Sequence, residues 1–193
     1  MKLSILICSH KKRKPLLRRM LKHLNEQTYR NPEDVEILVC ENDDPFVRGT
    51  SRNSLIDRAS GDYCCFVDDD DIVSDDYVSK ILNTIETGPE ICSITGLVIS
   101  MLNHESHKFM LSTRHTKPFS LPSNDIEDDT YKRFASHLNP IKTEIIRQVR
   151  FSSEKICHED NTYSQRLKDF KQDWNEEEID GVLYYYFNRV KIS

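Results

Sequence analysis

The sequence lacks any long hydrophobic run. No segment approaches the roughly 18 consecutive apolar residues of a transmembrane helix. The apolar opening Leu3–Cys8 is too short for the core of a signal peptide, and charged residues follow it. There is also no internal repeat and no low-complexity tract, which argues against a solenoid or fibrous architecture. We therefore expect a cytoplasmic protein without a membrane span of its own.

Paired cysteine motifs are also missing. The chain has six cysteines, but none forms the CxxC spacing of zinc or redox sites. Most of them lie in apolar, strand-like runs, where buried and reduced thiols are the simplest interpretation. They are Cys8, Cys40, Cys64, Cys65, Cys92 and Cys157.

An excess of positive charge is absent as well. The net charge of −5 argues against nonspecific nucleic-acid binding by the whole molecule. The exception is local, because basic residues crowd the stretch Lys11–Lys22. This stretch could attract phosphates or a polyanionic acceptor, or it could be the solvated face of an amphipathic helix, which is the favoured interpretation.

The length of 193 residues predicts one domain. Short apolar runs alternate with helical patterns in the first half, which is typical of βαβ units and a mostly parallel sheet up to about residue 100. The expected strands are Leu3–Cys8, Val35–Cys40 and Tyr63–Val67. The expected helices follow Pro15, run over Ser51–Ala59, and begin at a Ser74 cap.

The second half is less regular. The sequence predicts strands over Ile91–Leu102 and Lys108–Leu111 and a helix over Glu159–Phe170. Val182–Phe187 is a late strand or an apolar docking segment. The polar stretch His115–Asp129 predicts a loop that could act as a lid.

Four consecutive aspartates, Asp68–Asp71, directly follow the apolar run Tyr63–Val67. Adjacent carboxylates repel one another unless a cation or hydrogen-bond donors compensate, and a hard divalent cation prefers oxygen ligands. In an open α/β sheet, ligands gather at the carboxyl ends of the strands. This block therefore predicts a cation site, although four aspartates could also cap a turn and face solvent.

Several segments in order resemble the glycosyltransferase family 2 signature of the GT-A fold. The segments are Gly49–Asn53, Ala59–Tyr63, Phe66–Asp71, and His158–Asp160 with Arg166 six residues later. The acidic turn near Glu41 also lies where the family has one, so the resemblance covers essentially the whole chain. It implies a single Rossmann-like α/β GT-A domain over residues 1–193. Residues 1–100 would form a nucleotide-sugar-binding half and residues 101–193 an acceptor-binding half.

The family resemblance also implies an activity. Such an enzyme is a metal-dependent, inverting glycosyltransferase that moves a sugar from a nucleoside diphosphate sugar, with a UDP-sugar favoured, to an acceptor hydroxyl, here expected on a saccharide. The cofactor would be Mn²⁺ or Mg²⁺. Two alternatives remain open: the same chemistry on a hydroxylated base of DNA, possibly viral, and a noncatalytic module that only binds nucleotide-sugars.

By resemblance, Asp70 is the expected direct metal ligand, and Asp68 reaches the metal waters or the ribose. Asp160 is the expected general base for the acceptor hydroxyl, with Glu159 as the second candidate. Without the family match, acidic residues at this position would simply suit the start of a helix.

The resemblance places further residues at the nucleotide-sugar: Ser9, Glu41, Asp43, Arg52, Asn53, Asp68 and Asp69. The turn Glu41-Asn42-Asp43 departs from the more usual Asp-Asp-Gly-Ser pattern, which leaves the nucleobase open, and Asn42 and Asp43 could instead form an Asx turn before Pro45. Arg52 could hold the diphosphate or pin a carboxylate of the aspartate block.

Three aromatic side chains have two interpretations each. His137 and His158 could line the acceptor pocket or the metal shell, but a lone histidine is more often structural. Trp174 could stack on a sugar or a base, and packing at the sheet edge is the favoured interpretation.

Overall fold

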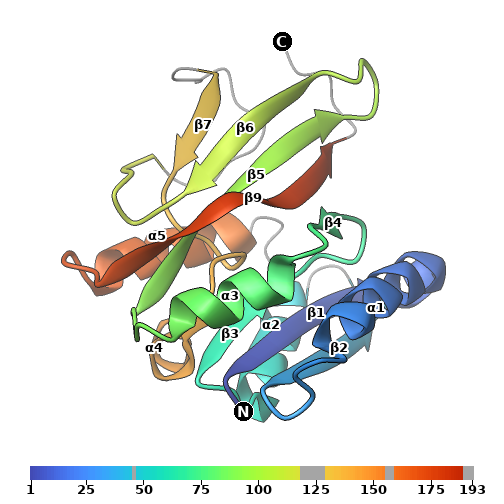
Figure 1. Ribbon diagram of the computed structural model, residues 1–193, viewed down its shortest axis with the longest axis horizontal. Helices are drawn as coiled ribbons and strands as arrows, with labels where there is room; N and C mark the ends of the chain where they lie inside the picture. Colours follow the sequence, from blue (N-terminus) through green and yellow to red (C-terminus); the bar gives the residue numbers. More distant parts are fainter. Residues whose placement is uncertain (45–46, 118–128, 155–158, 189–193) are drawn as a thin grey trace.

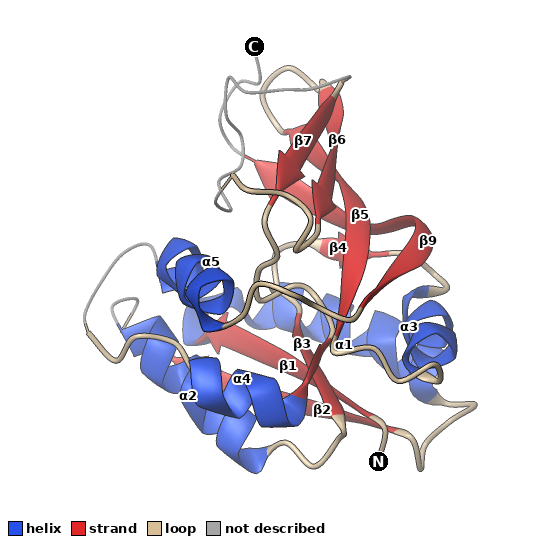
Figure 2. Ribbon diagram, turned by 90° about the vertical axis from the view of Figure 1, so that its left-hand side faces the viewer, coloured by secondary structure: helices blue, strands red, loops and turns tan. Residues whose placement is uncertain are grey.

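Nine strands of the described residues form one sheet, which helices cover on both faces in its first half (Figures 1 and 2). The structure is a computed structural model and describes residues 1–44, 47–117, 129–154 and 159–188. The strands are β1 Leu3–His10, β2 Val35–Asn42, β3 Tyr63–Phe66, β4 Ile72–Val73, β5 Ile91–Ser100, β6 Ser106–Leu111, β7 Thr130–Arg133, β8 Ile141–Lys142 and β9 Glu176–Asn188. The helices are the 3₁₀ turn η1 Lys11–Arg13, α1 Lys14–Thr28, α2 Arg48–Arg58, α3 Tyr77–Ile85, α4 Thr143–Val149 and α5 Glu159–Phe170.

The main path of the sheet has the order β2-β1-β3-β8-β5-β6-β7, and β9 pairs with β5 and β4. The expected parallel arrangement is confirmed for β2-β1-β3, where Leu3 of β1 aligns with Val35 of β2 and Tyr63 of β3. The second half adds antiparallel pairs, such as β5 with β6 and β3 with β8. The fold is therefore mixed α/β, with its parallel part in the first half of the chain.

Alternating residues of the central strands serve two separate cores, because successive side chains of a strand point to opposite faces. In β1, Leu3 and Ile5 face a core that α1 and α3 cover, while Leu6 faces a core that α2, α4 and α5 cover. Both cores are fully sealed around β1, whose residues Leu3 to Ile7 have no exposed surface. This explains why the run has almost no polar interruption.

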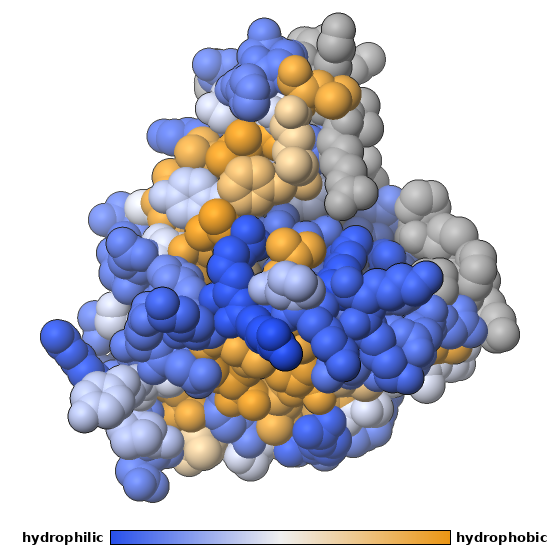
Figure 3. All heavy atoms as spheres, turned by 90° about the vertical axis from the view of Figure 1, so that its right-hand side faces the viewer, coloured by the Kyte–Doolittle hydropathy of each residue, from blue (hydrophilic) through white to orange (hydrophobic). Residues whose placement is uncertain are grey.

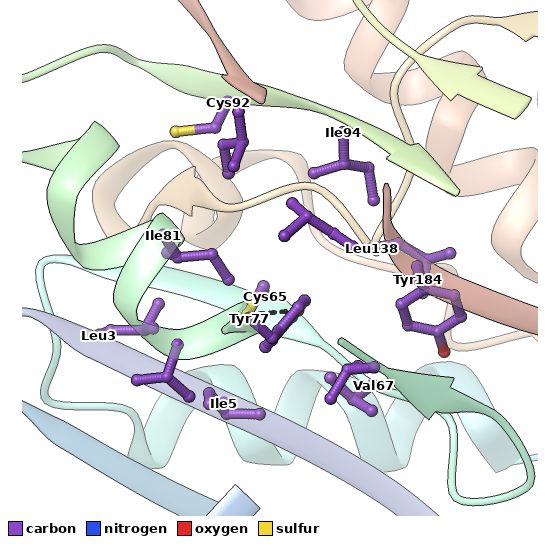
Figure 4. Close-up of a cluster of buried hydrophobic side chains, with 14 of the residues drawn as sticks. Leu3, Ile5, Cys65, Val67, Tyr77, Ile81, Cys92, Ile94, Leu138 and Tyr184 are labelled. Atoms are coloured by element: carbon purple, nitrogen blue, oxygen red, sulfur yellow. Dashed lines mark hydrogen bonds between the residues drawn. The ribbon is translucent and has the colours of Figure 1, made fainter. Parts of the chain in front are cut away.

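The core beneath α3 also joins the two halves of the chain. Figure 4 shows Val67 and Ile94 of residues 1–100 in one cluster with Leu138 and Tyr184 of residues 101–193. Strand β9 returns from the end of the chain to pair with β4, where Tyr184 aligns with Val73. The last strand therefore packs beside the aspartate block.

The secondary structure confirms most of the expected elements and adds some. The helix over Glu159–Phe170 has its predicted bounds, and the late strand is longer than predicted. The Ser74 cap was wrong, because α3 begins at Tyr77 and the Ser74 hydroxyl bonds the Asp76 carboxylate at 2.7 Å. Strands β4, β7 and β8 and helix α4 were not predicted. Most of the expected loop His115–Asp129 lies outside the described residues.

The five cysteines within the described ranges are free thiols, as expected, and Cys157 lies outside those ranges. Among the helices that the structure describes, none combines the length and apolar character needed to cross a lipid bilayer.

Candidate active site

A cleft of about 490 Å³ opens at the carboxyl ends of β1, β2 and β3. Figure 3 views the molecule from the side to which β1 and β2 point in Figure 1, and hydrophilic residues dominate the middle of this face. Seven carboxylates and three arginines line the cleft: Asp44, Asp68, Asp69, Asp70, Asp71, Glu159 and Asp160 against Arg13, Arg48 and Arg52. The lining therefore carries an excess of negative charge.

Two buried side chains, Arg52 and His137, hold the partly exposed carboxylate of Asp68. Its carboxylate lies 3.3 Å from Nη2 of Arg52 and 3.7 Å from Nε2 of His137. Its backbone N–H donates to the Tyr184 hydroxyl at 3.0 Å. Burial alone would raise the pKa of Asp68, but His137 and Arg52 outweigh it and hold that pKa below its ordinary value. Asp68 is therefore a stable carboxylate in the cleft.

Asp69 and Asp70 share one arginine. Nη1 of Arg13 lies 3.0 Å from Oδ1 of Asp69 and 2.9 Å from Oδ2 of Asp70. Asp69 is buried and also accepts a 2.5 Å hydrogen bond from the Ser9 hydroxyl, so Ser9 and Asp69 meet at the edge of the cleft. Asp70 is more exposed, and burial together with the charge of Asp68 raises its pKa.

Asp71 binds β9. It accepts hydrogen bonds from the Tyr184 hydroxyl at 2.9 Å and from the backbone N–H of Phe187 at 3.0 Å. Burial and the nearby charge of Asp68 hold the pKa of Asp71 well above its ordinary value. The fourth aspartate therefore anchors the last strand beside the block.

Arg52 links the aspartate block to the Glu159–Asp160 pair. Its guanidinium is buried over the rings of Phe66 and Phe151, at 5.5 and 5.1 Å from their centroids. Nη1 lies 3.2 Å from Oε1 of Glu159, while Nη2 reaches Asp68. The guanidinium of Arg52 thus joins two motifs that are far apart in the sequence.

Glu159 and Asp160 differ in access to the cleft. Glu159 is buried and faces Arg52, with Arg48 a further 3.9 Å contact. Asp160 is half-buried in the first turn of α5 and lines the cleft, and its Oδ1 accepts only the N–H of Asn161 among the hydrogen bonds found in the described residues. Of the two expected bases, Asp160 is the one with an accessible carboxylate.

The turn after β2 contributes less than expected. Asn42 lines the cleft, donates to the Ser51 hydroxyl at 3.1 Å and accepts from the N–H of Asp44 at 3.0 Å. Glu41 and Asp43 are exposed, lie outside the residues that line the cleft, and Asp43 pairs with Lys11 at 2.8 Å. The Asx turn considered for Asn42 is therefore present.

Asn53 also lies outside the lining. Its carboxamide donates to the backbone oxygen of Phe151 at 3.0 Å and accepts from the N–H of the same residue at 2.9 Å. These paired bonds attach α2 to the chain before α5. In this structure Asn53 holds α2 against the backbone of Phe151 and is not among the residues that line the cleft.

Several residues of the lining were not assigned to the site from the sequence, among them Arg13, His137 and Tyr186. Arg13 follows the first strand within a run of basic residues, which was the only available signal. His137 is buried beside Asp68, against the structural role that the sequence favoured, and no local pattern marks it. Tyr186 of β9 lines the cleft, where burial and the neighbouring carboxylates raise its pKa to about 12.

The other aromatic candidates are placed more simply. Trp174 packs partly against the second core and its indole N–H donates to the Lys171 carbonyl at 2.9 Å, so it takes the favoured packing role. His158 lies outside the described residues.

No group of three His, Cys, Asp or Glu side chains in the described residues is arranged to hold a metal ion. The donors still fit a divalent cation whose shell a ligand completes, because Asp70 and Asp68 offer hard carboxylate oxygens. The excess of carboxylates in the lining would also repel an anionic ligand unless cations accompany it.

Comparison with known proteins gives one family and one fold. The sequence profile described as Glycosyl transferase family 2 matches residues 36–166, which contain both the aspartate block and Glu159–Asp160. No curated protein sequence matches the chain.

Solved structures of S. aureus TarS resemble this chain in fold. TarS 1–349 is 15% identical with a TM-score of 0.62, and the match covers 97% of this chain and 60% of that one. Another structure of TarS is 15% identical with a TM-score of 0.66, over 97% of this chain and 37% of that one. TarS 1–349 in complex with UDP-GlcNAc is 15% identical with a TM-score of 0.61, over 100% and 60%. The chain thus spans about 60% of TarS 1–349, and the expected GT-A fold is confirmed.

Proposed function

The chain belongs to glycosyltransferase family 2, and we propose that it transfers a sugar from a nucleoside diphosphate sugar to an acceptor hydroxyl, with inversion at the anomeric carbon. The observation that carries this proposal is the meeting of two acidic motifs at one cleft. Arg52 bridges Asp68 of the first motif and Glu159 of the second. Donor and acceptor would therefore bind on opposite sides of a fixed ion pair.

A UDP-sugar is the favoured donor. The likeness in fold to TarS, which was solved with UDP-GlcNAc and with UDP, supports a uridine nucleotide. Asn42 is the residue of the turn after β2 that lines the cleft, and its carboxamide could bond a nucleobase edge. Glu41 and Asp43 would contact the nucleotide-sugar from outside the cleft, at its rim. Asp68 is assigned to the donor, while Ser9 and Asp69 line the cleft and support the block through their mutual hydrogen bond.

Asp70 is the proposed metal ligand, with Asp68 reaching the metal through water. When bound, Mn²⁺ or Mg²⁺ would act as a Lewis acid on the departing diphosphate. The partial exposure of Asp70 and the charge of the cleft support this assignment. Arg52 keeps Asp68 ionised and oriented, so the carboxylate is ready to accept bonds from the donor.

Asp160 is the proposed general base. It would accept the proton of the acceptor hydroxyl while that oxygen forms a bond to the anomeric carbon and the bond from this carbon to the diphosphate oxygen breaks. Attack from the face opposite the leaving group gives inversion. The engagement of Glu159 with Arg52 leaves Asp160 as the base.

A saccharide is the favoured acceptor, and a hydroxylated base of DNA is the alternative. The observation behind the alternative is the exposed basic run Lys11, Lys12, Lys14 and Arg18, which follows β1 at the edge of the cleft. Tighter binding to DNA than to oligosaccharides, with a steep dependence on salt, would favour the DNA acceptor. A cytoplasmic location, expected from the reduced cysteines and the lack of a long hydrophobic run, stays a prediction.

A thermal-shift panel of nucleoside diphosphate sugars with and without Mn²⁺ tests donor binding. A ligand that binds only the native state raises its melting temperature, so we expect a shift with a UDP-sugar that requires the metal. The absence of a shift with every donor would contradict the proposal.

The Asp160→Asn variant tests the base. We expect transfer or donor hydrolysis to fall by about 10²–10⁴-fold, with donor affinity and melting temperature unchanged. Asp169→Asn is the matched control, because it removes an exposed carboxylate of the same helix. Unchanged transfer by Asp160→Asn, together with loss in Asp70→Ala, would make the assignment of the base wrong. A wild-type protein that binds the donor but neither transfers nor hydrolyses it would be a noncatalytic binding module.

A further inference from the structure

Arg13 forms an ion pair with Asp70, the carboxylate that is proposed to bind the metal. One nitrogen of its guanidinium lies 2.9 Å from Asp70 and 3.0 Å from Asp69. Asp69 has a second partner in Ser9 and is almost fully buried. Asp70 is 37% exposed, and Arg13 is its one ion-pair partner among the described residues. A cation that binds Asp70 must therefore compete with Arg13.

Arg13 is also placed so that it can move. Its side chain lines the cleft and is 37% exposed, and it extends from the short turn η1. Arg52, by contrast, is buried between two rings and bridges two carboxylates. Arg48 lies near Glu159, on the side of the second motif. Of the three arginines in the lining, Arg13 is therefore the one whose side chain can change partners at the lowest cost.

The charges of the cleft determine which ligand can replace Asp70 as the partner of Arg13. A divalent cation that arrives alone would take Asp70 and leave the Arg13 guanidinium beside a like charge, which is unfavourable. A diphosphate that arrives with the cation would offer Arg13 new oxygen acceptors, and a guanidinium binds phosphate oxygens in a planar fork. The second ligand thus compensates for the contact that the first one breaks.

We propose that Arg13 exchanges between Asp70 and the diphosphate of the donor, so that the metal and the nucleotide bind cooperatively. The inference rests on the proposed function of the cleft as a metal-dependent nucleotide-sugar site. Arg13 is a positioning residue in this scheme and takes no part in proton transfer. The exchange keeps the metal affinity low until a donor is present.

Binding of Mn²⁺ and UDP to Arg13→Gln tests the exchange. Free Mn²⁺ is measured by electron paramagnetic resonance, with and without UDP, and UDP binding by calorimetry, with and without Mn²⁺. In the wild type we expect UDP to raise Mn²⁺ affinity, and by linkage Mn²⁺ to raise UDP affinity by the same factor. In Arg13→Gln we expect Mn²⁺ alone to bind at least about fivefold tighter and the coupling factor to fall by at least about fivefold.

Two further variants separate exchange from general charge. Arg30→Gln removes the same charge from an exposed position just after α1 and should leave both quantities unchanged. Arg13→Lys keeps the charge but has no fork, so its coupling factor should lie between those of the wild type and Arg13→Gln. If Arg13→Gln did not fold, the reduced coupling in Arg13→Lys would carry the test.

The outcomes are distinguishable. Equal Mn²⁺ affinity and equal coupling in Arg13→Gln and the wild type would overturn the exchange and leave the proposed function intact. Equal tightening in Arg13→Gln and Arg30→Gln would also overturn it, because the effect would then come from net charge. A wild type that binds neither UDP nor Mn²⁺ would overturn the proposed function and the exchange together.

Discussion

Four identical residues in a row have four different surroundings. Asp68 contacts Arg52 and His137, Asp69 contacts Ser9, and Asp70 shares Arg13 with Asp69 and faces the cleft. Asp71 instead binds β9. Like charges this close would destabilise the fold if each had no partner. Distribution of the partners over β1, α2 and β9 relieves the repulsion and leaves Asp70 as the most available carboxylate of the block.

Asp71 is expected to matter for stability and Asp70 for ligand binding. In Asp71→Ala the buried Tyr184 hydroxyl and the Phe187 N–H lose their acceptor, which should lower the free energy of unfolding by about 1–3 kcal/mol. Urea denaturation measures this difference. Asp70→Ala, at a partly exposed position, should change it by less than about 0.5 kcal/mol.

A double variant makes the Asp71 prediction specific. Because Asp71 and Tyr184 contact each other, Asp71→Ala combined with Tyr184→Phe should lose less stability than the sum of the single losses. Additive losses would show that the contact with β9 contributes little.

Helix α2 is placed by its close approach to the chain before α5. A Cβ atom on Gly49 would collide with the backbone carbonyl of Ser152, so only glycine allows this distance. One turn later, Asn53 bonds the backbone of Phe151 in both directions. Because Arg52 precedes Asn53 in α2, we expect the same contact to fix the position of Arg52 between the two acidic motifs. A shift of α2 relative to the chain before α5 would therefore also shift Arg52 in the site.

Gly49→Ala should disturb both folding and binding. The new methyl group must push α2 away from Ser152, which should cost about 1–3 kcal/mol of stability and weaken UDP binding because Arg52 moves with the helix. Urea denaturation and calorimetry measure the two effects. Thr50→Ala, at the adjacent exposed position, is the control and should change neither. Unaltered UDP affinity in Gly49→Ala would separate the docking of α2 from the site.

The whole molecule has a core that is common to both halves of the chain. Residues of β1, α1 and α3 pack with residues of β5 and β9 in one cluster. The salt bridge between Lys171 and Glu90, at 2.5 Å, adds a connection between the end of α5 and the start of β5. A shared core predicts that residues 1–100 and 101–193 unfold together.

Unfolding of Leu183→Ala tests this cooperativity. Leu183 of β9 is fully buried, so its truncation should cost about 2–5 kcal/mol. The fluorescence of Trp174, the one tryptophan of the chain, and the far-ultraviolet circular dichroism should shift to the same lower midpoint. Glu177→Ala, an exposed change in the same strand, serves as the control. Separate midpoints for the two signals would mean that the halves unfold independently.

The sequence by itself determined the fold class, the order of the motifs and most elements of the first half. Apolar runs that are buried on both faces and helices with one apolar face are local patterns, so β1, β2, β3 and α5 could be predicted. The two-residue strands β4 and β8 could not, because their pairing depends on partners far along the chain.

Only the tertiary structure decided which carboxylates are available. Neighbouring aspartates look alike in the sequence, yet their contacts with Arg13, Arg52 and Tyr184 come from other elements. The difference in burial between Glu159 and Asp160, the contacts of Asn53 with Phe151 and the position of His137 beside Asp68 depend on such contacts too. A side chain's charge and access are set by what packs around it, and chain neighbours alone do not specify that environment.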